Sequence, residues 1–364
     1  MNDTLLAAAQ DAVGSYPDPV LGRELAAADA VHSLEVADGQ ATVEIRLPLP
    51  ADRYGPILAA ALEERLTALD GVESAAVTVN WDVPRGPVAA GREPIPGVRN
   101  IVAIASGKGG VGKSTTTVNL ALALAAEGAT VGIMDADIYG PSQPKMLGLS
   151  GRRPTSVDGQ RLEPLVAHGI QCMSIGFLVG EDDPMVWRGP MATSALNQLL
   201  GQTDWRDLDY LLVDMPPGTG DIQLTLSQQV PVSGAVIVTT PQDIALLDAM
   251  KGLMMFKKVS IPVLGIIENM SVHVCSNCGH REPIFGEGGG SRLSERYEVP
   301  LLGALPLDIR IREETDDGRP TVAVDPDAPV AAAYIDTARR MAAVLADVSG
   351  NAAAPFPNIV MEDD

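Results

Sequence analysis

Short apolar runs alternate with longer amphipathic segments over most of the chain, from residue 99 onward. A short apolar run bounded by turn residues is typical of a buried strand, whereas the longer segments have the spacing of helices. The runs that predict strands are 101–105, 130–134, 170–173, 210–213, 235–239, 263–267 and 302–304. The segments that predict helices are 116–126, 191–200, 221–229, 243–257, 291–298 and 328–348. This alternation predicts an α/β fold with a mostly parallel, doubly wound sheet that is covered by helices on both faces.

The first 82 residues have a different pattern, which predicts a small α+β domain. Two alternating segments flank Asp38-Gly39, a pair that is typical of the tight turn of a β-hairpin. The expected elements are a helix over 4–13, strands over 31–36 and 41–47, a helix over 54–68 and a strand over 75–80. We therefore predict a separate domain over residues 1–82.

A linker is predicted between this domain and the rest of the chain. Residues 83–98, VPRGPVAAGREPIPGV, are rich in Pro, Gly and Ala and have no apolar periodicity, which is typical of a connecting segment. The α/β pattern then occupies residues 99–350, and residues 351–364 are expected to form an acidic tail.

Composition places the protein in the cytoplasm. No uninterrupted apolar run reaches the about 18 residues that a membrane span needs, and the start, Met1-Asn2-Asp3, lacks the basic residues of a signal peptide. Three cysteines in 364 residues are too few for a disulfide framework, which fits a reducing compartment. We therefore expect a cytoplasmic protein that does not associate with a membrane.

The net charge argues against nucleic acid as a partner. The chain carries a formal charge of −21, and contact with DNA needs a basic surface that displaces counterions. We expect no nucleic-acid binding.

The strongest chemical signal is a glycine-rich segment that fits the phosphate-binding pattern G-x-x-x-x-G-K-[ST]. It consists of Gly107, Lys108, Gly109, Gly110, Val111, Gly112, Lys113, Ser114 and Thr115. A predicted strand precedes it and a predicted helix follows, so that backbone N–H groups and a helix N-terminus converge on a phosphate. A glycine-rich turn could match the pattern by chance, but these flanking elements favour a phosphate loop. Lys113 would contact the β and γ phosphates of a nucleoside triphosphate, and the Ser114 hydroxyl would bind Mg²⁺.

Acidic residues follow two predicted strands, at the edge where open α/β sheets bind their ligands. Asp135 and Asp137 follow the second predicted strand of the α/β pattern. Two carboxylates beside a triphosphate suit two roles, one linked to the metal ion and one that orients the attacking water. Asp214 ends an apolar strand, which is the usual place of the acid linked to the Mg²⁺ of a phosphate loop. An acidic turn at a strand end is the alternative, and the nearby phosphate loop favours the binding role.

The segment after Asp214 is a candidate switch. Gly218-Thr219-Gly220 could approach the γ-phosphate through its backbone and change shape on hydrolysis. We expect Asp221 to cap the helix that follows.

Cys275 and Cys278 form a C-x₂-C motif, which brings two thiolates to one metal ion or to one face of a cluster. A cluster usually needs four ligands, and Cys172 is expected to be a small buried residue. A homodimer that contributes the pair from each subunit would supply four. The alternatives are a zinc knuckle that uses His280, a redox dithiol or a tight turn. Gly279 and its polar neighbours predict an exposed loop, which suits a labile site.

Lys108 makes the segment GKGGVGKST resemble the deviant phosphate loops of the MinD, ParA and nitrogenase-iron-protein class of ATPases. The resemblance implies that Lys108 crosses a dimer interface to the partner's nucleotide, whereas Lys113 serves its own subunit. It also implies that Asp137 positions the hydrolytic water, that Asp135 lies on the same switch, and that Asp214 is linked to Mg²⁺.

Within that class, the chain from about residue 99 to 320 resembles the Mrp/ApbC-type iron–sulfur cluster carriers. The resemblance rests on DADIYGPS, WRGPM (residues 187–191), DMPPGTGD and ENMSVHVCSNCGH (residues 268–280). It implies a homodimer that holds a labile [4Fe–4S] cluster through Cys275 and Cys278. The dimer would accept clusters from scaffold donors, pass them to apoprotein acceptors and slowly hydrolyse ATP. Asn269 matches an asparagine that contacts the nucleotide base in related ATPases.

The domain over residues 1–82 is similar to the small MIP18/DUF59-like domain that often precedes these ATPases. It contains no cysteine, unlike some domains of that type. The alternative function is a MinD/ParA-like switch that dimerises on ATP and carries a structural zinc at the C-x₂-C motif. Positioning on a membrane would need a basic amphipathic terminal helix, whereas this C-terminus is acidic and contains Pro355 and Pro357.

Overall fold

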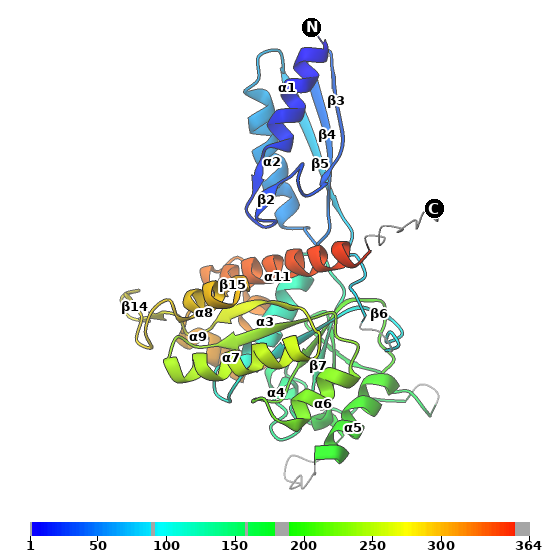
Figure 1. Cartoon of the computed structure of the whole chain (residues 1–364), viewed down its shortest axis with the longest axis vertical. Helices are drawn as coiled ribbons and strands as arrows, with labels where there is room; N and C mark the ends of the chain where they lie inside the picture. Colours follow the sequence, from blue (N-terminus) through cyan, green and yellow to red (C-terminus); the bar gives the residue numbers. More distant parts are fainter. Residues whose placement is uncertain (1, 89–91, 157–158, 179–188, 354–364) are drawn as a thin grey trace, which may run out of the picture.

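The computed structural model of the chain describes residues 2–88, 92–156, 159–178 and 189–353. A narrow N-terminal domain stands on a wider α/β domain, and the long last helix lies where the two meet (Figure 1). None of the helices in this described part is long and apolar enough to span a lipid bilayer.

The N-terminal domain packs helices against one face of a three-stranded sheet. Its elements are α1 (Asn2–Gly14), β1 (Pro17–Asp18), β2 (Arg23–Glu24), β3 (Val31–Ala37), β4 (Gln40–Leu47), α2 (Tyr54–Thr67) and β5 (Ser74–Trp81). Strands β3 and β4 form the predicted hairpin, and Asp38 and Gly39 turn the chain with φ angles of 48° and 79°. Strand β5 then pairs parallel to β4, so that α2 provides the crossover that a parallel pair requires.

The α/β domain is built on an eight-stranded sheet in the order β15-β12-β11-β6-β10-β7-β9-β8. Its strands are β6 (Val98–Ala105), β7 (Val131–Asp135), β8 (Leu165–Ala167), β9 (Ile170–Ser174), β10 (Leu208–Asp214), β11 (Gly234–Thr239), β12 (Val263–Glu268) and β15 (Leu301–Ala304). Neighbours are parallel except β8 and β9. Every residue of β11 is buried, as expected for a strand between two helical layers. The predicted fold class is confirmed.

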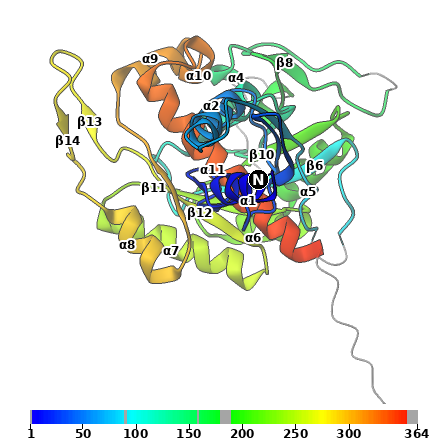
Figure 2. The ribbon, with the colours of Figure 1, turned by 90° about the horizontal axis from the view of Figure 1, so that it is seen from above.

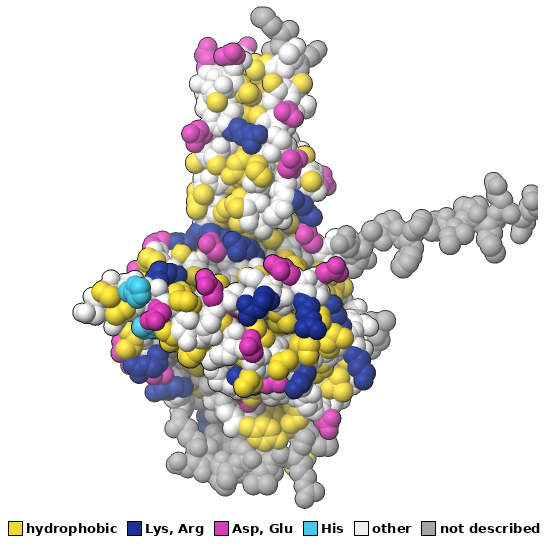
Figure 3. Space-filling model, turned by 60° about the vertical axis from the view of Figure 1, so that its left-hand side comes forward, with side chains coloured by type: hydrophobic (Ala, Val, Ile, Leu, Met, Phe, Trp, Pro, Cys, Tyr) yellow, Lys and Arg dark blue, Asp and Glu magenta, His cyan; other side chains and the backbone are white. Residues whose placement is uncertain are grey.

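Helices cover both faces of this sheet, and a small hairpin extends from it. The helices are α3 (Lys113–Ala126), α4 (Gln143–Met146), a 3₁₀ turn (Ile175–Phe177), α5 (Gly189–Gln202), α6 (Asp221–Gln229), α7 (Asp243–Lys258), α8 (Gly289–Tyr297), α9 (Ile309–Asp316), α10 (Thr321–Val324) and α11 (Pro329–Ala353). Strands β13 (His273–Val274) and β14 (Arg281–Glu282) form a hairpin that projects beyond the sheet (Figures 1 and 2). Histidine side chains gather on this projecting edge in Figure 3.

Several short elements were not predicted. Strands β8, β13 and β14 have two or three residues, and helices α4 and α10 have four. Segments of this length contain too few positions for an apolar period to appear, and α9 has few apolar residues. The longer predicted strands and helices are all present, with ends that differ by a few residues.

The structure corrects two expectations about helix ends. Asp221 is not the cap of α6: Gly220 occupies the N-cap position in an extended conformation, and Asp221 is the first helical residue. Helix α11 runs on to Ala353, so its last three residues lie in the segment expected to be an acidic tail. Residues 354–364 lie outside the described part, as do Trp187 and Arg188 of the WRGPM motif.

The segment predicted as a linker lies against the α/β domain at its start. Val83 is buried, and the Gly86 N–H donates a hydrogen bond of 2.6 Å to the side-chain oxygen of Asn100 on β6. Residues 83–88 and 92–97 contain no helix or strand.

One buried carboxylate joins the two domains. Glu127, at the C-terminal end of α3, is 1% exposed, and its Oε2 accepts the backbone N–H groups of Arg53 and Tyr54 at 3.1 Å each. Its Oε1 accepts a hydrogen bond of 2.8 Å from Nε of Arg339 on α11. The Arg339 guanidinium also lies over the Tyr54 ring, 5.2 Å from its centre. The Glu127 carboxylate therefore accepts hydrogen bonds from the free N–H groups at the start of α2. It also compensates the positive charge of Arg339.

Candidate functional site

The glycine-rich segment forms a loop between the end of β6 and the start of α3. Gly112 has a φ of 80°, and a Cβ there would lie 2.2 Å from the side-chain nitrogen of Asn269. A Cβ on Gly107 would lie 2.1 Å from the carbonyl carbon of Asp248 on α7. The first glycine is therefore required by close packing, and the later one by a left-handed backbone as well. The predicted strand–loop–helix arrangement is present.

Lys113 and Asp214 meet beneath this loop. The Lys113 ammonium donates to the Asp214 carboxylate and lies 3.2 Å from the Ser114 hydroxyl. The Thr117 hydroxyl also donates to Asp214, at 3.1 Å. The structure thus brings together three residues that the sequence placed in the site, and Thr117 is an addition from the next turn of α3.

Asp135 holds the turn that follows β7. Its carboxylate accepts the N–H groups of Asp137, Ser142 and Gln143 at 3.0 to 3.2 Å, and the Ser174 hydroxyl at 3.1 Å. Burial, followed by the negative charge of nearby Asp214, raises the pKa of Asp135 to about 7. These bonds give Asp135 a structural role in the turn, and its predicted link to Mg²⁺ stays a prediction.

Asp137 and Lys108 are more accessible than the residues beneath them. Asp137 is half-buried, and burial raises the pKa of its carboxyl group while the Lys113 charge opposes the shift. Lys108 is half-buried, and its ammonium forms no ion pair within the described ranges. Both side chains are therefore placed to meet a ligand or a second molecule.

A cleft adjoins the phosphate loop on the side of α9. Asn269 follows β12, and its side-chain NH₂ donates a hydrogen bond of 2.9 Å to the Val111 carbonyl. The cleft measures about 160 Å³, and its lining includes Thr115, Leu307 and Tyr334. Its position beside the loop and its partly apolar walls suit a nucleoside. Asn269 lines this cleft, and its contact with the nucleotide base stays a prediction.

The two cysteines lie at the tip of the β13–β14 hairpin. The Cys275 N–H donates to the His280 carbonyl at 2.9 Å, and the Gly279 N–H donates back to the Cys275 carbonyl at 2.8 Å. Gly279 adopts a φ of 71°. The N–H group of Asn277 and then that of Cys278 lower the pKa of the Cys275 thiol. The tight turn thus presents two accessible sulfur atoms and favours a thiolate at one of them.

The set of metal ligands is incomplete within the described part of one chain. No group of three or more His, Cys, Asp or Glu side chains is arranged there to hold a metal ion. Cys172 is fully buried on β9, and burial raises the pKa of its thiol. Strand β9 lies five positions from β12 in the sheet, about 24 Å at the usual strand spacing. Cys172 therefore cannot join the pair.

The phosphate loop and the cysteine hairpin share one edge of the sheet. Strands β6 and β12 are both parallel to β11, so their carboxyl ends point the same way. The loop follows β6, and the hairpin follows β12 two strand positions away. This is the edge at which open α/β sheets bind ligands.

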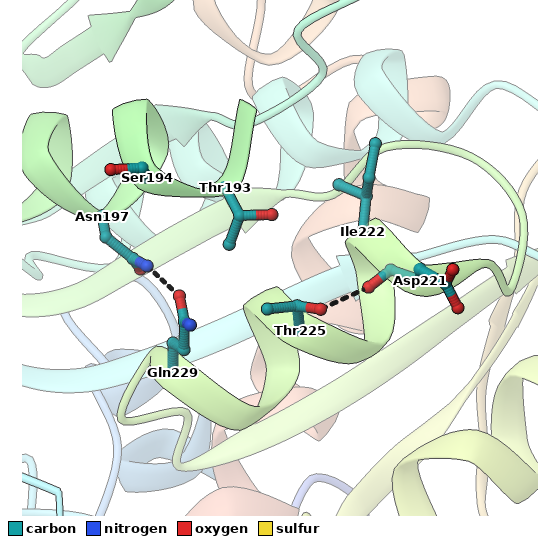
Figure 4. A pocket seen from close by; sticks show the side chains of 7 residues that line it. All are labelled: Thr193, Ser194, Asn197, Asp221, Ile222, Thr225 and Gln229. Carbon is teal, nitrogen blue, oxygen red and sulfur yellow. Dashed lines mark hydrogen bonds between the residues drawn. The ribbon is translucent and has the colours of Figure 1, made fainter. Parts of the chain in front are cut away.

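A separate pocket of about 550 Å³ lies between α5 and α6. Figure 4 shows that Asn197 and Gln229 meet across it, and that the Thr225 hydroxyl contacts the Asp221 carbonyl within α6. Its lining combines hydroxyl and amide groups with one carboxylate and the apolar Ile222, and none of the described lining residues is Lys, Cys or His. The pocket is therefore distinct from the phosphate and cysteine sites.

Gln143 is a site residue that sequence reasoning missed. It lies one position beyond the DADIYGPS motif and is fully buried. Its side-chain NH₂ donates to Asp214 at 2.9 Å and to the Ser114 carbonyl at 3.1 Å. No sequence pattern distinguishes a glutamine with this role from any other glutamine at the start of a short helix.

Two family models match the chain. Residues 97–342 match a model described as NUBPL iron-transfer P-loop NTPase, and residues 6–79 match one described as iron–sulfur cluster assembly protein. The first match covers more than half of the chain.

Relatives match over most of the chain or over about two thirds of it. An iron–sulfur cluster carrier protein of Salmonella typhimurium is 51% identical over 343 residues, 94% of this chain and 93% of its own. An iron–sulfur cluster transfer protein NUBPL of Mus musculus is 55% identical over 249 residues, 68% of this chain and 78% of its own.

Solved structures resemble the α/β domain. A nucleotide-binding protein of Archaeoglobus fulgidus in complex with ADP aligns with a TM-score of 0.57 and 39% identity, over 65% of this chain and 91% of that one. The cell-division ATPase MinD of Pyrococcus furiosus aligns with a TM-score of 0.50 and 24% identity, over 66% of this chain and 98% of that one. The second likeness concerns the fold alone.

Proposed function

The chain belongs to the family of NUBPL iron-transfer P-loop NTPases, and from this premise we propose that it is a homodimeric carrier of iron–sulfur clusters that binds and slowly hydrolyses ATP. The observation that carries the proposal is the pair of accessible thiols on the same sheet edge as the phosphate loop. The tight turn holds the two thiols close together, but the described part of one chain does not complete the ligand set of a metal site.

Cys275 and Cys278 from each of two subunits would hold one [4Fe–4S] cluster as cargo. Four thiolates are the usual ligand set of such a cluster, and a two-fold axis places the same hairpin twice. The cysteine hairpin is an accessible projection (Figure 2). Accessibility suits transfer, because an acceptor protein must approach the cluster to take it.

The nucleotide would occupy the phosphate loop and the adjoining cleft. Lys113 and the loop N–H groups would bind the β and γ phosphates, and Asn269, which lines the cleft, would contact the base. Asp137 would orient the attacking water, and Lys108 would reach the nucleotide of the partner subunit. The accessible positions of these last two side chains support that division of roles.

The donor set beneath the loop suits Mg²⁺. The Ser114 hydroxyl and the Asp214 carboxylate lie together, and the buried Oε1 of Gln143 has no hydrogen-bond partner in the described structure. Mg²⁺ commonly keeps several waters and takes few protein ligands beside phosphates. When bound, the ion would neutralise charge on the phosphates.

The partners we propose are scaffold proteins that donate clusters and apoproteins that accept them, in the cytoplasm. The N-terminal domain has no cysteine, so its contribution would be contact with these partners rather than ligation of the cluster. Its match to a cluster-assembly domain over residues 6–79 supports that contribution.

Anaerobic reconstitution with iron and sulfide tests the cluster proposal. We expect a brown dimer with about four irons for each pair of subunits, the content of one [4Fe–4S] cluster. Cys275→Ala and Cys278→Ala should each abolish it, whereas Cys172→Ala should retain it because that thiol is buried on β9. A full cluster in the Cys275→Ala variant would overturn the bridging arrangement. Stoichiometric zinc that resists chelation, without visible absorption, would instead favour an ATP-dependent dimerisation switch with a structural metal.

A further inference from the structure

Gln143 connects three parts of the nucleotide site. Its backbone N–H donates to Asp135 at 3.1 Å, which ties it to the end of β7. Its side-chain NH₂ donates to Asp214 at the end of β10 and to the Ser114 carbonyl at the start of α3. The residue is 0% exposed. One residue, through its backbone and its side chain, thus bridges two strand ends and the phosphate loop.

The orientation of the Gln143 carboxamide is determined by its neighbours. Asp214 Oδ2 and the Ser114 carbonyl are both acceptors, so the atom that faces them must be the NH₂ donor. The carbonyl oxygen, Oε1, is therefore the other terminal atom of the carboxamide, and neither of these two acceptors can satisfy it. It is buried and has no hydrogen-bond donor in the described part of the chain.

A buried acceptor without a donor is unfavourable, and native structures contain few of them. Phosphate oxygens accept hydrogen bonds and cannot satisfy a carbonyl. Bound Mg²⁺ commonly retains several waters, and these are strong donors. Asp214 and Ser114, which contact the same carboxamide, are the residues proposed to lie beside that ion.

We propose that Gln143 is a positioning residue for the metal–nucleotide complex, whose Oε1 accepts a hydrogen bond from the hydration shell of Mg²⁺ while its NH₂ holds Asp214 in place. The inference rests on the proposed binding of a nucleotide. If Oε1 bonds to the hydration shell, the contribution of Gln143 to nucleotide affinity depends on the metal. The phosphates alone cannot donate a hydrogen bond to a carbonyl oxygen.

The test compares ADP affinity with Mg²⁺ and with EDTA by calorimetry. Gln143→Met keeps the length of the side chain and removes its hydrogen bonds. Mg²⁺ should increase the ADP affinity of the wild-type protein. We expect this increase to be about tenfold smaller in the Gln143→Met variant, which is the usual effect of losing such hydrogen bonds. The affinity in EDTA should change by less than about threefold.

Gln223 offers a matched control. It is 5% exposed, lies in the segment after β10, and its NH₂ donates to the carbonyls of Pro216 and Pro217 rather than to Asp214. Gln223→Met removes the same chemistry from a buried carboxamide that does not contact Asp214, and it should leave the gain from Mg²⁺ unchanged. Thermal unfolding of each variant shows whether the fold is intact. Should Gln143→Met not fold, Gln143→Asn, which keeps the carboxamide on a shorter stem, should show the same selective loss.

Equal losses of affinity with Mg²⁺ and with EDTA would overturn the inference, since they would indicate a merely structural residue. So would an unchanged gain in the Gln143 variants or a matching loss in Gln223→Met. A wild-type protein that binds ADP under neither condition would instead overturn the proposed nucleotide site, and this inference with it.

Discussion

The ammonium group of Lys113 is hydrogen-bonded to the carboxylate of Asp214, 101 residues further along the chain, where the two side chains are 6% and 0% exposed. The pair joins the start of α3 to the end of β10. Lys113 therefore has a second role beside the contact with phosphate that its motif predicts. It also compensates the charge of a buried acid.

This pairing separates the effects of the two lysines of the phosphate loop. Lys113→Ala should abolish nucleotide binding and lower the free energy of unfolding by about 3–5 kcal/mol, because it leaves a buried carboxylate without its partner. Lys108→Ala should leave stability and ATP binding unchanged and impair only hydrolysis that depends on the dimer. Calorimetric titration, thermal unfolding and phosphate release measure the three quantities. An equal loss of ATP affinity in both variants would contradict the assigned roles.

Asp135 should make stability depend on pH. Its pKa is raised from 3.8 to about 7 in the folded protein, so the folded state binds more protons than the unfolded state between those values. The contribution of this group to stability is fully present below pH 3.8 and is lost as pH rises toward 7. The slope is at most about 1.4 kcal/mol for each pH unit.

Asp135→Asn isolates this contribution, because asparagine does not titrate. Whatever the substitution does to the hydrogen bonds of the turn is independent of pH. We expect the variant to gain stability relative to wild type as pH rises from 4 to 7, in urea titrations at several pH values. A difference between the two proteins that stays constant over this range would show that Asp135 ionises normally.

Gly279 sets the shape of the cysteine turn. Its φ of 71° lies in the left-handed region, where a residue with a Cβ is less stable by roughly 1–2 kcal/mol. Gly279→Ala should therefore shorten the lifetime of the reconstituted cluster on exposure to a chelator, and Gly279→Asn should recover part of it.

Gly201→Ala is the control for that effect. A Cβ on Gly201 meets no atom within 4 Å, and the residue lies in α5 with no left-handed φ. The cluster should have its normal lifetime in this variant. A normal lifetime in Gly279→Ala as well would show that the turn adapts to a side chain.

Glu127 should hold the N-terminal domain in place. Glu127→Gln leaves the Arg339 guanidinium, 10% exposed, without its buried counter-charge, and such a loss destabilises by about 3–5 kcal/mol. Faster hydrogen exchange at the Arg53 and Tyr54 amides would show directly that the contact between Glu127 and the start of α2 is weakened. Asp327→Asn is the control. Asp327 is 78% exposed and pairs with Arg53 at the surface, so its loss should change the free energy of unfolding by less than about 1 kcal/mol.

The sequence predicted the features that depend on local pattern. The runs 101–105 and 210–213 became β6 and β10, because a strand buried on both faces needs a continuous apolar run. The phosphate loop was visible because glycine is needed where the backbone turns left-handed, as at Gly112, or packs closely, as at Gly107. The exposed turn of Cys275 and Cys278 followed from the glycine and polar residues around it.

The contacts that complete the site depend on residues far apart in sequence. Gln143 and Asp214 are 71 positions apart, and Glu127 and Arg339 are 212 apart. No period or motif relates such residues, because the strand order of the sheet and the docking of the domains bring them together. Asp221 was misplaced as a cap for a simpler reason: Gly220 can fill that position without a side chain.

The buried carboxylate of Glu127 limits how freely the two domains can be exchanged as modules. It terminates the phosphate-loop helix, and it also supplies the missing acceptor at the start of α2. A graft of this N-terminal domain onto another P-loop ATPase would therefore need an acid at the end of that host's phosphate-loop helix. It would also need an arginine at the place of Arg339 on the host's last helix. Without both, the start of α2 would lack the buried acceptor that anchors it in this protein.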